Sequence, residues 1–312
     1  MKKQLILLAN VGVALALAYF FLQSAGLDKV GSFLSHARVE FVVLGALFYS
    51  GMNLVNSFRI AWAVKRPWQP DLFFKHMTCM FLSDFTPGRA GYSSIVLKLR
   101  AAGVKSGAAL KALGVVFASD FFGRAVLAVA AIAVFAQTVH SEALVWAAAA
   151  MVALGVGVLF FIVRRVALLE RLFLWVPGFG TRLVAAYRGV VKYKATPAFL
   201  AGNVALSLLG ALLRGTAWML VFWSIGGFGF EVFVPAVLVS ALVTALSFVP
   251  VSLAGLGLQE GAGAFLFSVA LGVSLELAAA GMVLIRVMEF GSNGFWGWKE
   301  LLTNWRKTPS KT

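Results

Sequence analysis

Eight ionisable side chains lie within or beside strongly apolar segments, where each costs about 2.5 to 3.5 kcal/mol if it faces lipid. They are Arg89, Arg124, Arg214, Arg286, Asp84, Asp120, Glu260 and Glu289. Arginine binds phosphate through two parallel hydrogen bonds, so arginines that converge could bind an anion. The acids could orient those arginines or exchange a proton.

The alternative is that these charges only neutralise one another within the scaffold. Asp120 and Arg124 are one helical turn apart, as are Arg286 and Glu289, so each pair could bond within its own helix. Equal numbers of positive and negative groups favour this alternative. The free N–H groups and dipole of a broken helix favour an anion site instead. For Arg89 and Arg286 both interpretations stay open, whereas Arg214 is the weaker candidate for an anion.

Membrane helices must position these charges. Of 312 residues 61% are hydrophobic and 12% charged, and a helix of about 20 apolar residues spans a bilayer. The predicted full spans are 4–22, 39–60, 112–136, 143–163, 196–224 and 274–298. The net charge of +15 gathers in short segments between them, which indicates loops facing anionic lipid and argues against nucleic acid.

The basic clusters place both termini on the cytoplasmic side. They are Lys2–Lys3, Arg59 with Lys65 to Lys75, Lys98 to Lys111, Arg164 to Lys194 and Lys299 to Lys311. Segment 164–194 is predicted to be an amphipathic linker on the inner leaflet.

Two irregular segments, 76–101 and 233–271, are predicted to be re-entrant hairpins that enter from opposite faces. The residues that break their helices are Pro87, Gly88, Gly91, Pro250, Gly255 and Gly257. Interrupted segments in corresponding halves are typical of inverted repeats with a midplane site. We therefore expect one membrane domain, 1–312, with repeat halves 39–136 and 196–298.

Other chemistry has little support. Cys79 is the single cysteine, so no intramolecular disulfide or paired-cysteine metal site is possible. His36, His76 and His140 are far apart in sequence and predicted to lie in loops or at segment edges, in solvated or capping roles. Neither a phosphate-binding loop nor an HExxH motif occurs. We expect no enzymatic activity, no cofactor and no metal.

Glu260 opens the second arm of the hairpin 233–271. As an acid in the first turn it could cap that helix. Burial would instead raise its pKa and let it carry a proton. Capping is the simpler interpretation, and proton coupling is a hypothesis.

Several short motifs resemble the lysylphosphatidylglycerol synthetase transmembrane family, also called flippase-like proteins. They are Pro87-Gly88-Arg89-Ala90-Gly91, Ala108-Ala109-Leu110 leading to Asp120, Gly255-Leu256-Gly257 between Pro250 and Glu260, and Gly272-Val273 before Arg286. The resemblance covers nearly the whole chain. The family includes the membrane half of the bacterial multiple peptide resistance factor, where an attached synthase half makes the lipid.

The resemblance implies a fold of about eight membrane elements, with re-entrant helices, that moves a lipid between leaflets. Three ionic positions of the family are missing: Tyr92 replaces an acid, Val116-Phe117 replaces a Glu-Arg pair, and Gln259 replaces an arginine. These departures leave the headgroup open.

Together the residues and the resemblance predict an all-α polytopic protein of the bacterial inner membrane, with about six full spans, two re-entrant hairpins and an inverted repeat. We expect it to move a phosphate-bearing, anionic lipid. The predicted substrate-binding residues are Arg89, Arg124, Arg286, Asp120, Glu260, Tyr92 and Gln259. The alternative is a non-transporting scaffold that supplies lipid to a partner glycosyltransferase or synthase.

Overall fold

The computed structural model describes residues 26–86, 89–135, 196–226, 228–246 and 255–306, together with residues 12, 19 and 23. Every regular element in these ranges is a helix. The elements are α2 (Leu27–Ser35), α3 (Val39–Ala63), α4 (Pro70–Asp84), η1 (Ala90–Ser93), α5 (Ser94–Ala101), α6 (Ser106–Phe135), α10 (Pro197–Gly226), η2 (Phe230–Val232), α11 (Phe233–Leu246), α12 (Leu258–Leu271) and α13 (Leu275–Arg306). The all-α prediction is confirmed for this part of the chain.

Some predicted features lie outside the described residues. They are the span 143–163, the linker 164–194, nearly all of the span 4–22, and the helix-breaking residues Pro87, Gly88 and Pro250. The predicted spans 39–60, 112–136, 196–224 and 274–298 correspond to α3, α6, α10 and α13, with ends that differ by up to eight residues.

Three helices among the described residues are long and apolar enough to cross a membrane. They are α3, residues Ser106–Ala131 of α6, and α10, with mean hydropathies of 1.4, 1.7 and 1.7. Helices α11 and α12 are apolar but only 14 residues long. At 1.5 Å per residue each would cross about two thirds of a 30 Å hydrocarbon core.

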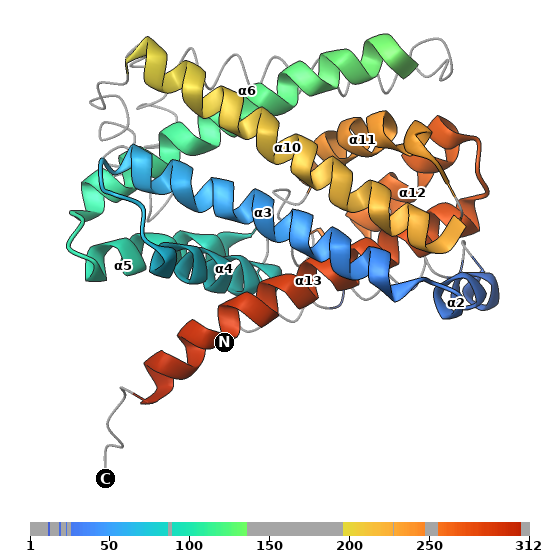
Figure 1. The fold of residues 1–312 in the computed structure, drawn as a ribbon, viewed down its shortest axis with the longest axis horizontal. Coiled ribbons are helices and arrows are strands. Elements are labelled where there is room, and N and C mark those ends of the chain that lie inside the picture. Colours follow the sequence, from blue (N-terminus) through green and yellow to red (C-terminus); the bar gives the residue numbers. More distant parts are fainter. Residues whose placement is uncertain are drawn as a thin grey trace.

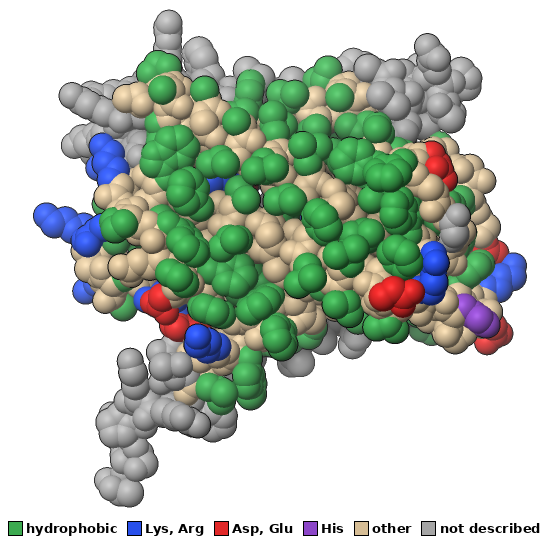
Figure 2. Space-filling view, viewed as in Figure 1, with side chains coloured by type: hydrophobic (Ala, Val, Ile, Leu, Met, Phe, Trp, Pro, Cys, Tyr) green, Lys and Arg blue, Asp and Glu red, His purple; other side chains and the backbone are tan. Residues whose placement is uncertain are grey.

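The surface matches this composition. On α3 the side chains of Val43, Leu47, Leu54 and Phe58 are exposed and repeat at helical spacing. Figure 2 shows hydrophobic side chains over the middle of this face and most charged side chains at its left and right margins. The helices run between those margins (Figure 1), so lipid would lie against the apolar middle of this face and water would meet the charged margins.

Helices α3 and α10 lie side by side through the centre of the molecule (Figure 1). Their close approach depends on Gly45, because a Cβ there would lie 3.0 Å from the Ala217 carbonyl oxygen. Beneath this pair, Trp218 and Phe222 of α10 pack against Phe267 of α12. The largest described hydrophobic core therefore joins α3 and α10 to the short helices α11 and α12.

The short helices lie at opposite ends of this central pair. In Figure 1, α4 and α5 lie beside the end of α3 that finishes at Ala63, and α11 and α12 lie toward the end of α10 that finishes at Gly226. Helix α13 passes beneath both groups and packs against α4 and α12.

Candidate functional site

The turn between α4 and α5 directs Arg89 into the protein. Arg89 has φ +56°, a left-handed conformation that is uncommon for a residue with a Cβ. Thr86 Oγ1 supports the turn by accepting the Gly91 N–H at 2.7 Å. Gly91 admits no side chain, because a Cβ would lie 2.6 Å from the Leu82 carbonyl oxygen. Arg89 is only 8% exposed, and its Nε has no hydrogen-bond partner among the described residues.

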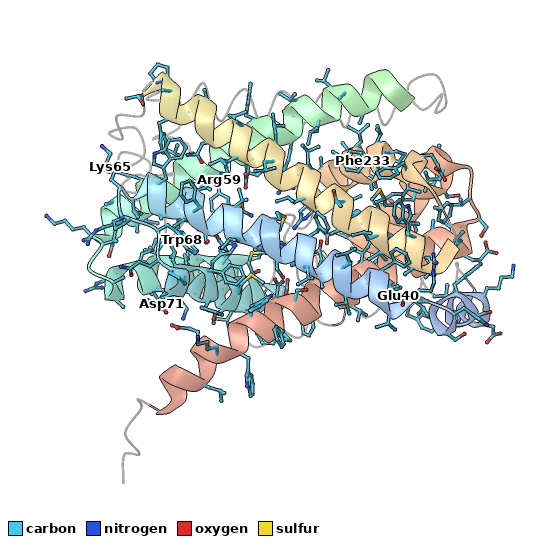
Figure 3. All side chains as sticks on the ribbon, viewed as in Figure 1. Glu40, Arg59, Lys65, Trp68, Asp71 and Phe233 are labelled. Carbon is cyan, nitrogen blue, oxygen red and sulfur yellow. The ribbon has the colours of Figure 1, made fainter. Side chains whose placement is uncertain are left out.

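Arg59 fixes α3 to α6 and α10. Its side chain is fully buried, and its Nη1 donates to Asp120 Oδ1 at 2.5 Å and to Asn56 Oδ1 at 3.0 Å. Its Nε donates to Asn203 Oδ1 at 3.1 Å and its Nη2 to the Val116 carbonyl at 3.2 Å. Figure 3 labels Arg59 near the crossing of these helices. A buried charge with this many partners is a structural anchor.

Arg214 of α10 is also paired. Its Nη1 donates to Thr244 Oγ1 at 2.7 Å, and its Nε lies 3.6 Å from Glu289 Oε1. The same carboxylate accepts the indole N–H of Trp218 at 3.1 Å. The guanidinium lies over the ring of Tyr49 at 5.7 Å. Arg214 is therefore paired with Glu289 of α13 and also lines a cavity.

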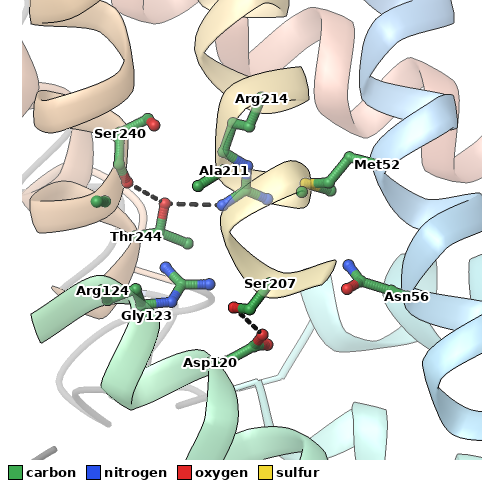
Figure 4. A pocket seen from close by; sticks show the side chains of 12 residues that line it. Met52, Asn56, Asp120, Gly123, Arg124, Ser207, Ala211, Arg214, Ser240 and Thr244 are labelled. Atoms are coloured by element: carbon green, nitrogen blue, oxygen red, sulfur yellow. Dashed lines mark hydrogen bonds between the residues drawn. The ribbon is translucent and has the colours of Figure 1, made fainter. Parts of the chain in front are cut away.

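A cavity of about 510 Å³ lies where these elements meet. Its polar lining includes Asn53, Asn56, His76, Arg89, Tyr92, Asp120, Arg124 and Arg214. Much of its apolar lining comes from α6, namely Leu110, Leu113, Phe117 and Phe121. A smaller cavity of about 40 Å³ adjoins it and shares Asp120, Arg124 and Arg214. Figure 4 shows Arg124 and Arg214 approaching this space from different helices.

The cavity lies near the middle of the three candidate spans. Asn56, Asp120 and Arg214 are each within about five residues of the midpoint of their helix. At 1.5 Å per residue this is about 8 Å along the helix axis. The volume falls within the range of about 300 to 1,000 Å³ that is usual for small-molecule sites. The site is thus a partly open cavity at mid-depth, large enough for a polar headgroup.

The charges around the cavity do not cancel. Asp120 pairs with Arg59 and also accepts the Ser207 hydroxyl at 2.7 Å, while Arg214 pairs with Glu289. Arg89 and Arg124 then remain, and the described part of the chain offers neither of them an ion-pair or hydrogen-bond partner.

Asp84 offsets this excess only in part. It lies near enough to Arg89 to attract it without an ion pair, and its Oδ2 accepts from Asn293 Nδ2 at 2.8 Å. Asp120 likewise attracts Arg124 without an ion pair. Among the described residues, four arginines (Arg59, Arg89, Arg124 and Arg214) then face three carboxylates (Asp84, Asp120 and Glu289), and the one positive charge in excess favours an anion there.

Tyr92 belongs to a hydrogen-bonded chain in the cavity wall. Its hydroxyl lies 3.0 Å from His76 Nδ1, and His76 Nε2 lies 3.1 Å from Asn53 Oδ1. Asn53 Nδ2 donates to the Tyr49 carbonyl at 3.1 Å, which fixes the orientation of the amide. His76 is 2% exposed, so the prediction of a solvated or capping histidine is wrong.

The other predicted site residues form a separate cluster where α12 begins. Glu260 accepts the Gly257 backbone N–H at 2.7 Å and pairs with Arg286 of α13. Arg286 Nη2 also donates to Gln259 Oε1 at 2.7 Å. Gly255 and Gly257 have φ of +78° and +81° directly before the helix. Glu260 therefore caps α12 and neutralises Arg286, and this cluster does not line either cavity described above.

The structure thus divides the predicted substrate-binding set. It brings Arg89, Tyr92, Asp120 and Arg124 together at the cavity, and it places Glu260, Arg286 and Gln259 in the cap of α12.

The proposed pairs within helices are wrong, because Asp120 bonds to Arg59, Glu289 to Arg214, and Arg286 to Glu260. The grouping of Arg59 with a loop cluster is also wrong. The sequence did carry a signal for Arg59, because this residue follows Asn53 and Asn56 at helical spacing.

Among the described residues, no three His, Cys, Asp or Glu side chains gather where they could hold a metal ion.

These features define a class: an all-helical, multi-pass membrane protein with an arginine-lined cavity at mid-depth. The family model described as "Lysylphosphatidylglycerol synthase TM region" matches residues 7–297, so the chain belongs to that family. The family links the chain to phospholipid metabolism and confirms the resemblance seen in its motifs. No curated protein matched the sequence.

Proposed function

We propose that this protein binds a phosphate-bearing lipid in the central cavity and moves it between the leaflets of the membrane. The observation that carries the proposal is the pair of guanidinium groups, Arg89 and Arg124, that face a mid-depth cavity without ion-pair partners in the described chain. Leaving charges unpaired there is costly for the folded protein alone. A phosphate would supply the missing partner.

The shape of the lining supports a lipid over a free anion. The cavity lining combines the guanidinium groups with apolar side chains, to which α6 contributes Leu110, Leu113 and Phe117. A headgroup phosphate could bind the arginines while the first acyl or prenyl carbons lie against the apolar wall. The neighbouring surface is apolar along α3, where exposed side chains such as Leu47 and Leu54 would meet lipid.

The arrangement of the short helices supports an alternating-access mechanism. We interpret α4 with α5, and α11 with α12, as re-entrant hairpins of an inverted repeat that enter from opposite faces. Each pair is followed by a glycine at positive φ, Gly103 at +81° and Gly272 at +64°, and then by a long helix. Rocking of one half against the other would expose the cavity to each leaflet in turn.

A transport assay in reconstituted vesicles tests the proposal. Fluorescent phosphatidylglycerol would be placed in both leaflets, and quencher added outside would report how fast inner-leaflet lipid becomes accessible. We expect acceleration over empty vesicles, and its loss in Arg124→Gln. Arg66→Gln is the matched control, because Arg66 donates to the Gly103 carbonyl at an exposed loop and lines neither cavity.

Failure of the wild-type protein to accelerate any of several phosphate lipids would contradict transport. It would favour the scaffold alternative, in which lipid is held for a partner enzyme. In that case lipid would still copurify with the wild-type protein and be reduced in Arg124→Gln.

A further inference from the structure

The exposure of the lining residues locates the opening of the central cavity, which is partly open. Two of the residues that line it are exposed, Ser93 at the end of η1 and Leu110 in α6. The lining residues from α3, α4, α10 and α11 are buried, apart from the half-buried Asn56. The mouth of the cavity therefore lies between the segment formed by η1 and α5 and the first part of α6.

The mouth extends from the basic loops toward mid-depth. Leu110 lies one turn into α6, about 6 Å along the axis from Ser106, and Ser93 lies about 12 Å from the end of α5. Arg100 and Lys105, near the connection between these two helices, are exposed. In Figure 1, α5 and the first turns of α6 lie at the end of the molecule where α3 finishes. The mouth therefore faces the leaflet beside the basic loops, which the distribution of Lys and Arg predicts to be the cytoplasmic leaflet.

The opposite end of the cavity is closed. Arg214 and Thr244 form this end of the lining, and they are 6% and 3% exposed. Farther along α10, Trp218 and Phe222 pack against Phe267 in the largest described core. In the part of the chain that the structure describes, the mouth is therefore the way into and out of the cavity.

The sides of the mouth are apolar, whereas the interior of the cavity is cationic. Val96 of α5 and Leu110 of α6 line the two sides, and Phe117 continues the apolar wall inward. Arg124 lies about four turns farther along α6 than Leu110, and Arg89 is buried. A phosphate at the arginines and a hydrocarbon chain at the mouth would each meet a surface of matching polarity. This division fits an amphipathic ligand better than a free anion.

We infer that the mouth between Ser93 and Leu110 is the portal through which a lipid enters the cavity sideways from the cytoplasmic leaflet. The headgroup passes inward to Arg89 and Arg124, and the hydrocarbon chain stays in the mouth, against the apolar side chains of α5 and α6. The portal rests on the proposed function, because it serves the same cavity, and it adds the leaflet and the route from which the substrate is loaded.

A protection experiment on the purified full-length protein in detergent tests whether lipid fills the mouth. Leu110→Cys places a thiol there, and the native Cys79 is 0% exposed, so it does not compete for a bulky maleimide. Leu97→Cys is the matched control, because Leu97 is exposed, lines neither cavity and lies one turn from the end of α5. With short-chain phosphatidylglycerol at about ten times its Kd, labelling of Leu110→Cys should slow about tenfold, and labelling of Leu97→Cys should not change.

Inorganic phosphate in the same experiment separates a lipid from a free anion. It can bind the arginines but has no chain to fill the mouth, so we expect it to leave the labelling of Leu110→Cys unchanged. Equal protection by inorganic phosphate and by the lipid would overturn the portal.

Labelling after reconstitution into vesicles tests the route and the leaflet. A membrane-impermeant maleimide should reach Leu110→Cys from the side of the C-terminus, which proteolysis of an added C-terminal tag would locate. The modified Leu110→Cys should lose the accelerated transport of phosphatidylglycerol, and the modified Leu97→Cys should keep it. Because both thiols react in the folded protein, such a loss cannot come from misfolding.

Three further outcomes would overturn the portal and leave the proposed function intact. They are binding of phosphatidylglycerol that protects neither thiol, labelling of Leu110→Cys from the opposite side of the membrane, and full transport after its modification. A wild-type protein that neither binds nor transports any of several phosphate lipids would instead count against the proposed function itself.

Discussion

Arg59 and Arg124 are both intramembrane arginines, yet the structure predicts opposite consequences when each loses its charge. Arg59→Gln breaks a buried ion pair and leaves Asp120 with Ser207 as its described hydrogen-bond donor. Removing one partner of such a pair typically costs about 3 to 5 kcal/mol. The Asp120 side chain is 23% exposed, so its carboxylate would not be left fully buried. We therefore expect the free energy of unfolding to fall by about 3 kcal/mol, the lower end of that range.

Arg124→Gln removes a charge that Asp120 attracts but that has no described ion-pair or hydrogen-bond partner, so little folding energy is lost. We expect the free energy of unfolding to stay within about 0.5 kcal/mol or to rise. Lipid binding should fall instead, because a hydrogen bond to a charged group contributes about 1.5 to 3 kcal/mol. That loss corresponds to a Kd raised by about 10- to 150-fold.

Unfolding in mixed micelles titrated with denaturing detergent, followed by tryptophan fluorescence, gives the first quantity. Trp218 is 3% exposed and therefore reports on the core. Binding of a labelled short-chain phosphatidylglycerol to the purified protein in detergent, measured for the wild type and for each variant, gives the second. If Arg124→Gln unfolds as easily as Arg59→Gln and both bind lipid equally, Arg124 is part of the scaffold and the charge argument for the cavity fails.

Gly91→Ala should destabilise the protein by about 1 to 3 kcal/mol, because the added Cβ would meet the Leu82 backbone. Gly107→Ala is the control and should leave the stability unchanged, because nothing lies within 4 Å of a Cβ at that position. Equal melting temperatures for the two variants would contradict this packing. Glu260→Gln should lower the unfolding free energy by about 1 to 3 kcal/mol through loss of a buried charge partner; a transport rate indifferent both to this change and to a pH gradient would exclude the proton-coupling hypothesis. The hydrogen bond from Lys29 lowers the pKa of Glu276 from 4.5 to about 2. Any stability from this exposed pair is therefore fully present above pH 4.5 and lost as the pH falls toward 2. The free energies of unfolding of wild type and Glu276→Gln should therefore differ by a constant amount between about pH 5 and 8. A difference that grows within that range would contradict the assignment.

Much of the fold could be predicted because its signals are local. Helices α3, α6 and α10 are apolar over lengths that span a bilayer, and a hydropathy window detects this without knowledge of neighbours. The interruptions near Arg89 and Gly257 were also visible, because glycine is favoured at the left-handed positions Gly255 and Gly257 and at Gly91, where a Cβ would meet the Leu82 backbone.

The candidate site was predictable only in part. The sequence identified Arg89, Asp120 and Arg124 as intramembrane charges, since any ionisable residue in an apolar segment stands out. It missed Arg59, which lies near the end of an apolar run and next to a basic loop, where a short-range count cannot distinguish a buried arginine from a cytoplasmic one. It also missed His76, whose partners Asn53 and Tyr92 come from other elements.

The sequence by itself determined that the chain is a helical membrane protein with too many intramembrane charges to face lipid. Only the tertiary structure decided which charges neutralise one another. Arg59 meets Asp120 across 61 positions and Arg286 meets Glu260 across 26, whereas the neighbours one turn away do not pair. An ion pair depends on a separation of a few ångströms in space, and helix packing sets that separation independently of distance along the chain. For this reason the two cavity arginines without a described ion-pair partner, Arg89 and Arg124, became apparent only when the helices were assembled.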